Sequence, residues 1–292
     1  MLRRQAAHAA ALGYDGVMVS EHHADFPGYL PNPVQLAGVL LDAMPSGWAA
    51  PCPMLLPLKP HALIVEDLAW LAAAYPGRVG VGFAAGALPV DFELAEVPFD
   101  EIVERFKAAL PLAVAALRGD VDGPLGRDRA VRRLADEPMP IVIAAQSPGA
   151  CRRAARLGCG VLYDSLQSAE VSARLGAAHR EAGAEHGRVL IRRVWIGEPP
   201  ADAMAAQMQH YRSYANDAAV QNWSDDSLVH GADAAEAADA LLAVLDASDC
   251  DTVNVRVHVK GLTPEMVDEQ LELHADGFVE RVRRGLAARV GG

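Results

Sequence analysis

Short apolar runs alternate with longer helical patterns along the chain, and this alternation limits the fold more than any other feature. The predicted strands are residues 16–20, 49–56, 78–83, 140–145, 160–164, 189–196 and 252–259. A helical pattern follows each strand, and strict alternation of this kind implies parallel strands joined by right-handed crossovers. Two architectures fit this order, a doubly wound open sheet and a (β/α)₈ TIM barrel.

The barrel is favoured over the open sheet. No Gly-x-Gly-x-x-Gly stands between the first strand and its helix, which weakens a dinucleotide-binding interpretation. The strands are apolar on both faces, as in barrels covered by helices. The first predicted element is a helix, residues 2–12. We therefore predict a single α/β domain over residues 1–292, a TIM barrel that lacks its first strand, with insertions near 118–139 and 197–231. The absence of a first strand favours a true N-terminus upstream of residue 1.

Details of the helical pattern lead to three further predictions. Asn32 should cap a helix that begins at Pro33. Pro111 should kink or split the helix of residues 100–117, because proline removes one hydrogen bond of the helix. One unbroken helix is expected near residues 264–287, after the last strand.

Charge and cysteine content exclude several classes of partner. The net charge is −12 and the pI is near 5.2, which argues against a nucleic-acid or membrane partner. The chain has no apolar run of about 18 residues. Its N-terminus lacks a credible signal peptide. The four cysteines form no Cys-x-x-Cys pair, and no metal-ligand cluster is visible. These observations predict a cytoplasmic protein with reduced thiols and no metal.

Catalytic groups of TIM barrels gather at the carboxyl ends of the strands, so those positions carry the functional predictions. Glu21, His22 and His23 directly follow the strand of residues 16–20. Histidine titrates near neutral pH and can act as an acid or a base. The alternative is a pair of loop histidines with ordinary contacts. Position alone does not separate these two interpretations.

A second candidate follows the strand of residues 140–145, where Gln146, Ser147, Gly149 and Ala150 open a helix. Backbone N–H groups at a helix start and the Ser147 hydroxyl suit a phosphate group. The alternative is a simple capped helix with Ser147 as the capping residue. Both interpretations can hold together.

Two other strand ends are candidates for contact with a flat ligand. The glycine-rich run from Gly80 to Gly86 includes Ala84 and Ala85 and lets a ligand approach the backbone, although glycines are also common in turns. The bond between Cys52 and Pro53 lies inside an apolar run. Proline there marks a bulge or a cis peptide.

These pieces occur in the order found in a known family. LGYDGVMVSEHH resembles the second strand of the bacterial luciferase-like flavin monooxygenases. MLLPLKPHALIVEDLAWLAAAYPGRVGVGFAAG is similar to the family's third strand, third helix and fourth strand. PIVIAAQSPGACRRAARLGCGVLY resembles its fifth strand and phosphate-binding helix start, and CDTVNVRVHV resembles its last strand. The likeness spans nearly the whole chain and is most specific in the first 160 residues.

The resemblance implies a reduced-FMN-dependent monooxygenase that oxidises a small organic substrate with O₂. His22 falls on the family's catalytic histidine, with Glu21 and His23 beside it. The phosphate site falls on Ser147, Gly149 and Ala150, with Gln146 nearby. The family's cis peptide falls on Cys52-Pro53, which we therefore predict to be cis. A flavin reductase would supply the reduced FMN, and the family favours dimers.

Two departures leave alternatives open. The family's phosphate-binding arginine corresponds to Ala85, and another phosphate-site hydroxyl corresponds to Ala150. A sister branch of the fold uses a 5-deazaflavin coenzyme for hydride transfer, and the missing arginine loosens the preference for FMN. A non-catalytic partner subunit is the other alternative, although the retained His22 argues against it.

Overall fold

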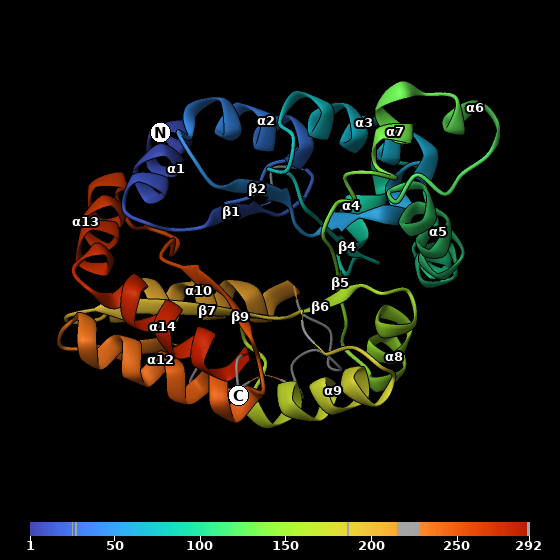
Figure 1. Ribbon diagram of the computed structural model, residues 1–292. Helices are drawn as coiled ribbons and strands as arrows, with labels where there is room; N and C mark the ends of the chain where they lie inside the picture. The colour runs from blue at the N-terminus through green and yellow to red at the C-terminus, as the bar shows by residue number, and fades with distance from the viewer. Residues whose placement is uncertain (25, 27, 186, 215–222, 224–227, 291–292) are drawn as a thin grey trace. The chain divides into compact units, whose positions relative to one another are not determined.

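The computed structural model describes every residue except 25, 27, 186, 215–222, 224–227 and 291–292 (Figure 1). The chain divides into two compact units. The N-terminal unit comprises residues 2–10 and 15–144, and the C-terminal unit comprises residues 1, 11–14 and 145–292. In both units parallel strands alternate with helices, as the sequence predicts.

The N-terminal unit contains the first five strands. They are β1 (Gly16–Val19), β2 (Trp48–Pro51), β3 (Met54–Leu55), β4 (Val81–Ala84) and β5 (Ile141–Ala144). Its α-helices are α1 (Leu2–Ala11), α2 (Pro33–Ala43), α3 (His61–Ala74), α4 (Pro89–Glu93), α5 (Ile102–Ala116), α6 (Gly123–Gly126) and α7 (Arg129–Arg133). Two 3₁₀ turns, η1 (Leu56–Leu58) and η2 (Phe99–Glu101), precede α3 and α5.

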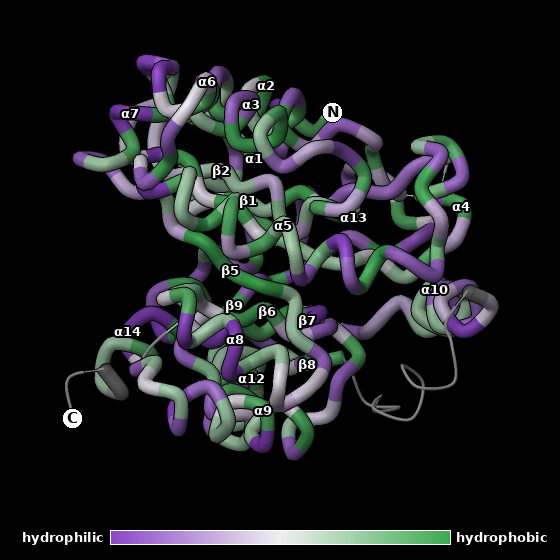
Figure 2. Tube along the Cα trace, turned by 90° about the vertical axis from the view of Figure 1, so that its right-hand side faces the viewer, coloured by the Kyte–Doolittle hydropathy of each residue, from purple (hydrophilic) through white to green (hydrophobic). Residues whose placement is uncertain are grey.

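All strand pairs in this unit are parallel. β1 pairs with β2, β3 with β4 and β4 with β5. The predicted strand of residues 49–56 is interrupted at Cys52-Pro53, because proline has no N–H to donate to a neighbouring strand. β5, with the sequence Ile-Val-Ile-Ala, is coloured as hydrophobic in Figure 2, as expected for a strand covered on both faces.

Two helices of this unit test the predictions made for them. The Asn32 side chain accepts a hydrogen bond from the Gln35 N–H at 3.0 Å, so the predicted cap of α2 is confirmed. Of the two outcomes predicted at Pro111, a kink or a split, the split does not occur. α5 continues through this proline from Ile102 to Ala116. Its buried face includes Phe106, Leu110 and Val114, and this packing stabilises the helix despite the proline.

The C-terminal unit is organised around one long buried strand. Its strands are β6 (Gly160–Tyr163), β7 (Arg188–Ile196), β8 (Leu228–Gly231) and β9 (Thr252–Arg256). Its helices are α8 (Pro148–Arg156), α9 (Ala169–Glu181), α10 (Ala201–Tyr214), α12 (Ala234–Ser248), α13 (Pro264–Ala275) and α14 (Phe278–Val290). β7 pairs in parallel with β6, β8 and β9, and all nine of its residues are buried.

Two elements of this unit differ from the sequence predictions. β8 was not among the predicted strands and lies at the end of the insertion predicted near residues 197–231. The predicted last helix is two helices, because Gly277 adopts a φ of +94° between α13 and α14. Glycine adopts this left-handed conformation without steric cost, and it ends helices for that reason.

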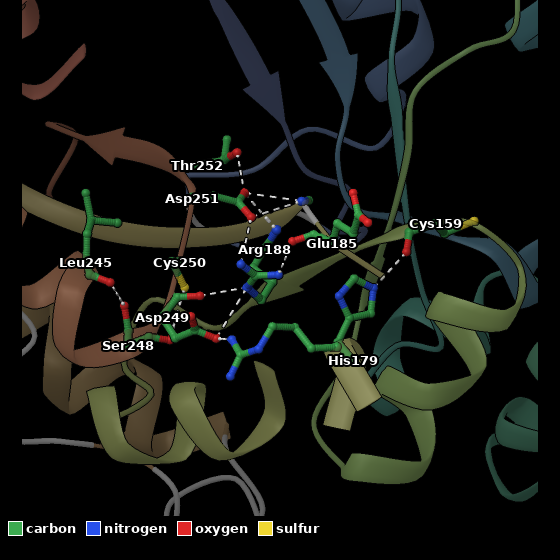
Figure 3. Close-up of polar contacts among 12 residues, drawn as sticks. Cys159, His179, Glu185, Arg188, Leu245, Ser248, Asp249, Cys250, Asp251 and Thr252 are labelled. Atoms are coloured by element: carbon green, nitrogen blue, oxygen red, sulfur yellow. Dashed lines mark hydrogen bonds and ion pairs between the residues drawn. The ribbon is translucent and has the colours of Figure 1, made fainter. Parts of the chain in front are cut away.

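A buried ion-pair cluster fixes the amino ends of β7 and β9 (Figure 3). The Asp251 carboxylate accepts hydrogen bonds from the Gly187 and Arg188 N–H groups and lies 3.2 Å from Nη2 of Arg188. Arg188 also donates to the backbone oxygens of Asp249 at 2.7 Å and Glu185 at 2.9 Å. These bonds satisfy charges that would otherwise be costly to bury.

The four cysteines are free and buried. Burial raises the pKa of the Cys52 thiol to about 12 and those of Cys151 and Cys250 to about 11. Such thiols are poor nucleophiles at neutral pH. None of the helices in the described part of the chain has the length and apolar character needed to cross a membrane.

Candidate functional site

Asp91 holds both histidines that follow β1. Its carboxylate is 1% exposed and lies in the first turn of α4, the short helix after β4. Oδ2 of Asp91 is 2.9 Å from Nδ1 of His22, and Oδ1 accepts the backbone N–H of His23 at 2.8 Å. One buried carboxylate therefore fixes the ring of one histidine and the backbone of the next.

The His22 ring is also fixed by two aromatic neighbours. Its centroid lies 4.7 Å from that of Phe26 and 4.6 Å from that of Tyr29, which meets it edge-on. The His22 side chain remains 22% exposed. Because an ionised carboxylate can only accept, the bond to Asp91 places the proton of a neutral His22 on Nδ1 and leaves Nε2 as the acceptor. The arrangement can therefore receive a proton at Nε2 and stabilise the resulting imidazolium.

Glu21 lies on the other side of His23. Its side chain is 4% exposed, Oε2 accepts the Leu55 N–H at 2.7 Å, and Oε1 lies 3.2 Å from Nε2 of His23. Burial raises the pKa of Glu21, and the bonds from Leu55 and His23 act in the opposite direction. Lys59 also favours the charged form. Glu21 and His23 thus form a second carboxylate–histidine pair.

A small pocket lies beside this second pair. Its volume is about 180 Å³, and it is formed by the segment after β1, by β3 and η1, and by the end of α4. Met54, Leu58 and Leu94 supply apolar surface, and the polar residues that line the pocket are Glu21, His23, Asn32, Lys59 and Asp91. A small molecule with one polar group fits this combination.

The peptide bond between Cys52 and Pro53 is cis, as predicted. A Cβ at Gly82 would lie 2.2 Å from the Cys52 Sγ, so the glycine of β4 is required by the packing of this thiol. The Phe92 ring occupies the corresponding space at Gly86, where a Cβ would lie 2.3 Å from the ring. Two glycines expected to admit a ligand are therefore explained by internal packing. Ala84 and Ala85 are half-buried.

In the C-terminal unit, Ser147 caps α8 as the simpler interpretation predicted. Its hydroxyl accepts the Ala150 N–H at 3.3 Å. Gln146, Ser147 and Gly149 are exposed, and a Cβ at Gly149 would meet no atom within 4 Å. Pro148 has no N–H, so the Gly149 N–H and the Ser147 O–H are the donors best placed for an anion.

Sequence reasoning missed Asp91, Phe26 and Tyr29. Asp91 lies almost 70 residues after His22, and the run Pro-Val-Asp-Phe-Glu indicates only the first turn of a helix. Among the residues that the structure describes, no three or more His, Cys, Asp or Glu side chains are grouped to hold a metal ion.

Comparisons with solved structures agree with the sequence resemblance. The monooxygenase RslO1 of Streptomyces bottropensis superposes with a TM-score of 0.77 at 20% identity, covering 96% of this chain and 92% of that one. The oxygenating constituent of 3,6-diketocamphane monooxygenase of Pseudomonas putida, solved with FMN, gives 0.73 at 16% identity with the same coverage. At these identities the likeness shows the fold, a luciferase-like TIM barrel, and confirms the predicted fold class.

Sequence comparisons lead to an F420-dependent enzyme and to uncharacterised proteins. The F420-dependent glucose-6-phosphate dehydrogenase of Beutenbergia cavernae is 27% identical over 195 residues, which cover 62% of this chain and 58% of that protein. For uncharacterised mycobacterial relatives at 30% identity, the match spans only 37% of their length.

The sequence model of the family described as luciferase-like monooxygenase matches residues 1–280, nearly the whole chain. This family includes FMN-dependent and F420-dependent oxidoreductases among the relatives found. The chain belongs to the luciferase-like monooxygenase family.

Proposed function

We propose that this chain is a reduced-FMN-dependent monooxygenase that oxidises a small organic substrate with O₂. The observation that carries the proposal is the bond from His22 to the buried Asp91, at the carboxyl end of β1, in a chain of this family. Carboxyl ends of barrel strands are where such enzymes place their catalytic groups.

The residues present can hold the cofactor in each unit. In the N-terminal unit, the cis peptide of Cys52 and Pro53 and the small, half-buried Ala84 and Ala85 would lie against the flat ring. In the C-terminal unit, the Ser147 hydroxyl and the exposed Gly149 N–H suit a phosphate. Gln146 and Ala150 would complete this site. When bound, reduced FMN would supply the two electrons with which O₂ delivers one oxygen atom to the substrate and the other to water.

In the proposed reaction His22 is the group that holds a proton. Nε2 accepts a proton, and the Asp91 carboxylate stabilises the charged ring that results. Phe26 and Tyr29 keep the ring from rotating and restrict the water around it. Asp91 is thus a positioning residue that acts through His22.

A deazaflavin-dependent oxidoreductase is the second candidate, and one observation favours it. Ala85 stands where the family's phosphate-binding arginine is expected, so a charge-assisted bond to the FMN phosphate is missing. The related glucose-6-phosphate dehydrogenase is F420-dependent. Hydride transfer to or from a substrate would then replace oxygen insertion.

Anaerobic titration with reduced FMN, oxidised FMN and the deazaflavin coenzyme tests the two candidates. We expect micromolar binding of reduced FMN and, after addition of ¹⁸O₂ with a panel of small aldehydes, ketones, alcohols and phenols, one labelled oxygen atom in the product. Binding of the deazaflavin alone, with unlabelled product, would replace the first candidate by the second. Binding of none of the three would overturn both.

His22→Ala separates chemistry from binding. Loss of a general acid or base lowers the rate by about 10²–10⁴-fold, whereas the affinity for reduced FMN should change little because His22 is not among the predicted phosphate or ring contacts. His61→Ala, at the start of α3, is the matched control and should keep the rate. Equal turnover of the His22 variant and the control would remove His22 from the mechanism.

Three further parts of the proposal concern the setting of the enzyme. A separate flavin reductase would supply reduced FMN, the chain would act as a dimer, and it would be cytoplasmic. Nucleic acid and membranes would not be partners, in keeping with the net charge of −12.

A further inference from the structure

The two histidines after β1 are held in opposite ways. His22 meets a carboxylate through Nδ1, at 2.9 Å from Asp91, whereas His23 meets one through Nε2, at 3.2 Å from Glu21. A neutral histidine carries one ring proton, on the nitrogen that faces an accepting partner. In its neutral form His22 would therefore be the Nδ1–H tautomer with Nε2 as acceptor, and neutral His23 would be the Nε2–H tautomer with Nδ1 as acceptor.

The pocket of about 180 Å³ belongs to the second pair. Glu21 and His23 line it, together with the apolar side chains of Met54, Leu58 and Leu94, whereas His22 is not among its lining residues. His22 instead packs against Phe26 and Tyr29. Nδ1 of His23 makes no hydrogen bond within the described residues, and the side chain is 22% exposed. The basic nitrogen of this pair is therefore free to meet a ligand.

The pocket is small and open to solvent, so it holds a small molecule or one end of a larger one. A water molecule takes about 30 Å³ in the liquid, so the pocket holds about six groups of that size. Its apolar wall favours a hydrocarbon body, and the acceptor nitrogen of His23 favours a hydroxyl group. Glu21 is already bonded to the Leu55 N–H and to the ring of His23, and Asp91 to the ring of His22 and the backbone N–H of His23. Glu21 therefore positions the ring of His23, and Asp91 positions its backbone.

We propose that Glu21 and His23 form a second proton-transfer site, which binds a small alcohol, phenol or enol in this pocket and accepts its hydroxyl proton. This inference deepens the proposed function. It rests on that function in one respect only, namely that the molecule bound in the pocket is the substrate. His23 is the catalytic residue of this site, and Glu21 is its positioning residue.

The transfer is a reversible acid–base step. The O–H bond of the ligand breaks, its proton forms an N–H bond at Nδ1 of His23, and the electron pair stays on the ligand oxygen. The imidazolium then donates through Nε2 to the Glu21 carboxylate, whose charge compensates the new positive charge. No oxidant or reductant is needed for this step.

The first test reads the two tautomers directly. Two-bond ¹H–¹⁵N correlation spectra of the full chain, labelled at histidine and recorded without cofactor, distinguish Nδ1–H from Nε2–H. We expect His22 as Nδ1–H and His23 as Nε2–H. An Nδ1–H form of His23 in the wild-type chain would overturn the proposal without any variant.

Two matched variants use the fact that each carboxylate already accepts a backbone N–H group through one of its oxygens. In Glu21→Gln, the amide oxygen is needed by the Leu55 N–H, so the NH₂ group faces His23 and should switch it to Nδ1–H. In Asp91→Asn, the oxygen is needed by the His23 N–H, so the NH₂ group should switch His22 to Nε2–H. Each variant should leave the other histidine unchanged.

Ligand binding then connects the tautomer to the pocket. Cyclopentanol, with six non-hydrogen atoms, should bind about fivefold more tightly than cyclopentanone, because only the alcohol donates to Nδ1. Glu21→Gln should abolish or reverse this preference, and Asp91→Asn should keep it. A wild-type chain without the preference, or an equal effect of both variants, would overturn the proposal. Failure of the chain to bind flavin would overturn the proposed function and leave these cofactor-free measurements intact.

Discussion

His274 should make the stability of this protein depend on pH between 7 and 4. Its side chain on α13 is 0% exposed, its Nδ1 lies 2.5 Å from the Tyr14 hydroxyl, and its ring stacks on Phe278 at 4.5 Å. Nε2 is buried with no hydrogen-bond partner within the described residues. Burial lowers the pKa of His274 from 6.5 to about 4, because a charged ring would be poorly solvated there.

The direction and size of the effect follow from proton binding. Well above pH 6.5 the ring is neutral in both states and contributes nothing to the pH dependence. As the pH falls, the unfolded chain binds a proton that the folded chain does not, so the free energy of unfolding decreases. With these two pKa values the loss is about 2 kcal/mol at pH 5 and about 3 kcal/mol at pH 4. Below pH 4 both states are protonated and the loss levels off.

Urea unfolding of the wild-type chain and of His274→Gln from pH 7.5 to pH 4 measures this loss. Glutamine does not titrate and can still bond to the Tyr14 hydroxyl, and all other groups titrate alike in the two proteins. The difference in unfolding free energy between them should therefore change by about 3 kcal/mol over this range. Parallel curves would refute the inference that His274 is neutral in the fold.

Two other substitutions test how buried groups are held. Asp251→Ala should lower the free energy of unfolding by about 3–5 kcal/mol, because it removes the carboxylate beside the buried Arg188. Asp239→Ala, which breaks an exposed ion pair, should lower it by about 1 kcal/mol or less. Equal shifts in the urea midpoint of the two variants would contradict this difference. Gly82→Ala should cost about 1–3 kcal/mol, because its Cβ would lie 2.2 Å from the Cys52 Sγ, and Cys52→Ala in the same chain should restore part of the loss.

The positions of the candidate site could be predicted from sequence because they depend on topology. Parallel strands place their carboxyl ends on one side of a sheet or barrel. His22 after β1 and Ser147 after β5 were therefore candidate site residues from the sequence alone. The cis bond at Cys52-Pro53 was also predictable, since proline lowers the cost of the cis form and the family resemblance points to that bond.

Partners distant in sequence could not be predicted in the same way. Nothing near Asp91 indicates that its carboxylate reaches back to His22 and His23, because long-range pairing leaves no local pattern. Gly277 shows a related limit. A single glycine inside a helical pattern can be tolerated or can end the helix, and only the packing of α13 and α14 decides.

Buried charge serves two purposes in this chain, and burial alone does not distinguish them. Asp251 is bonded to backbone N–H groups and to Arg188, whose guanidinium does not release its proton at any ordinary pH, so this pair can only stabilise. Glu21 and Asp91 are bonded to histidines, whose rings can carry the proton on either nitrogen, and both carboxylates line a pocket. The nature of the partner, more than the degree of burial, therefore identifies the carboxylates to which function should be assigned. By this criterion, the carboxylates of the site act most directly on the tautomers of His22 and His23.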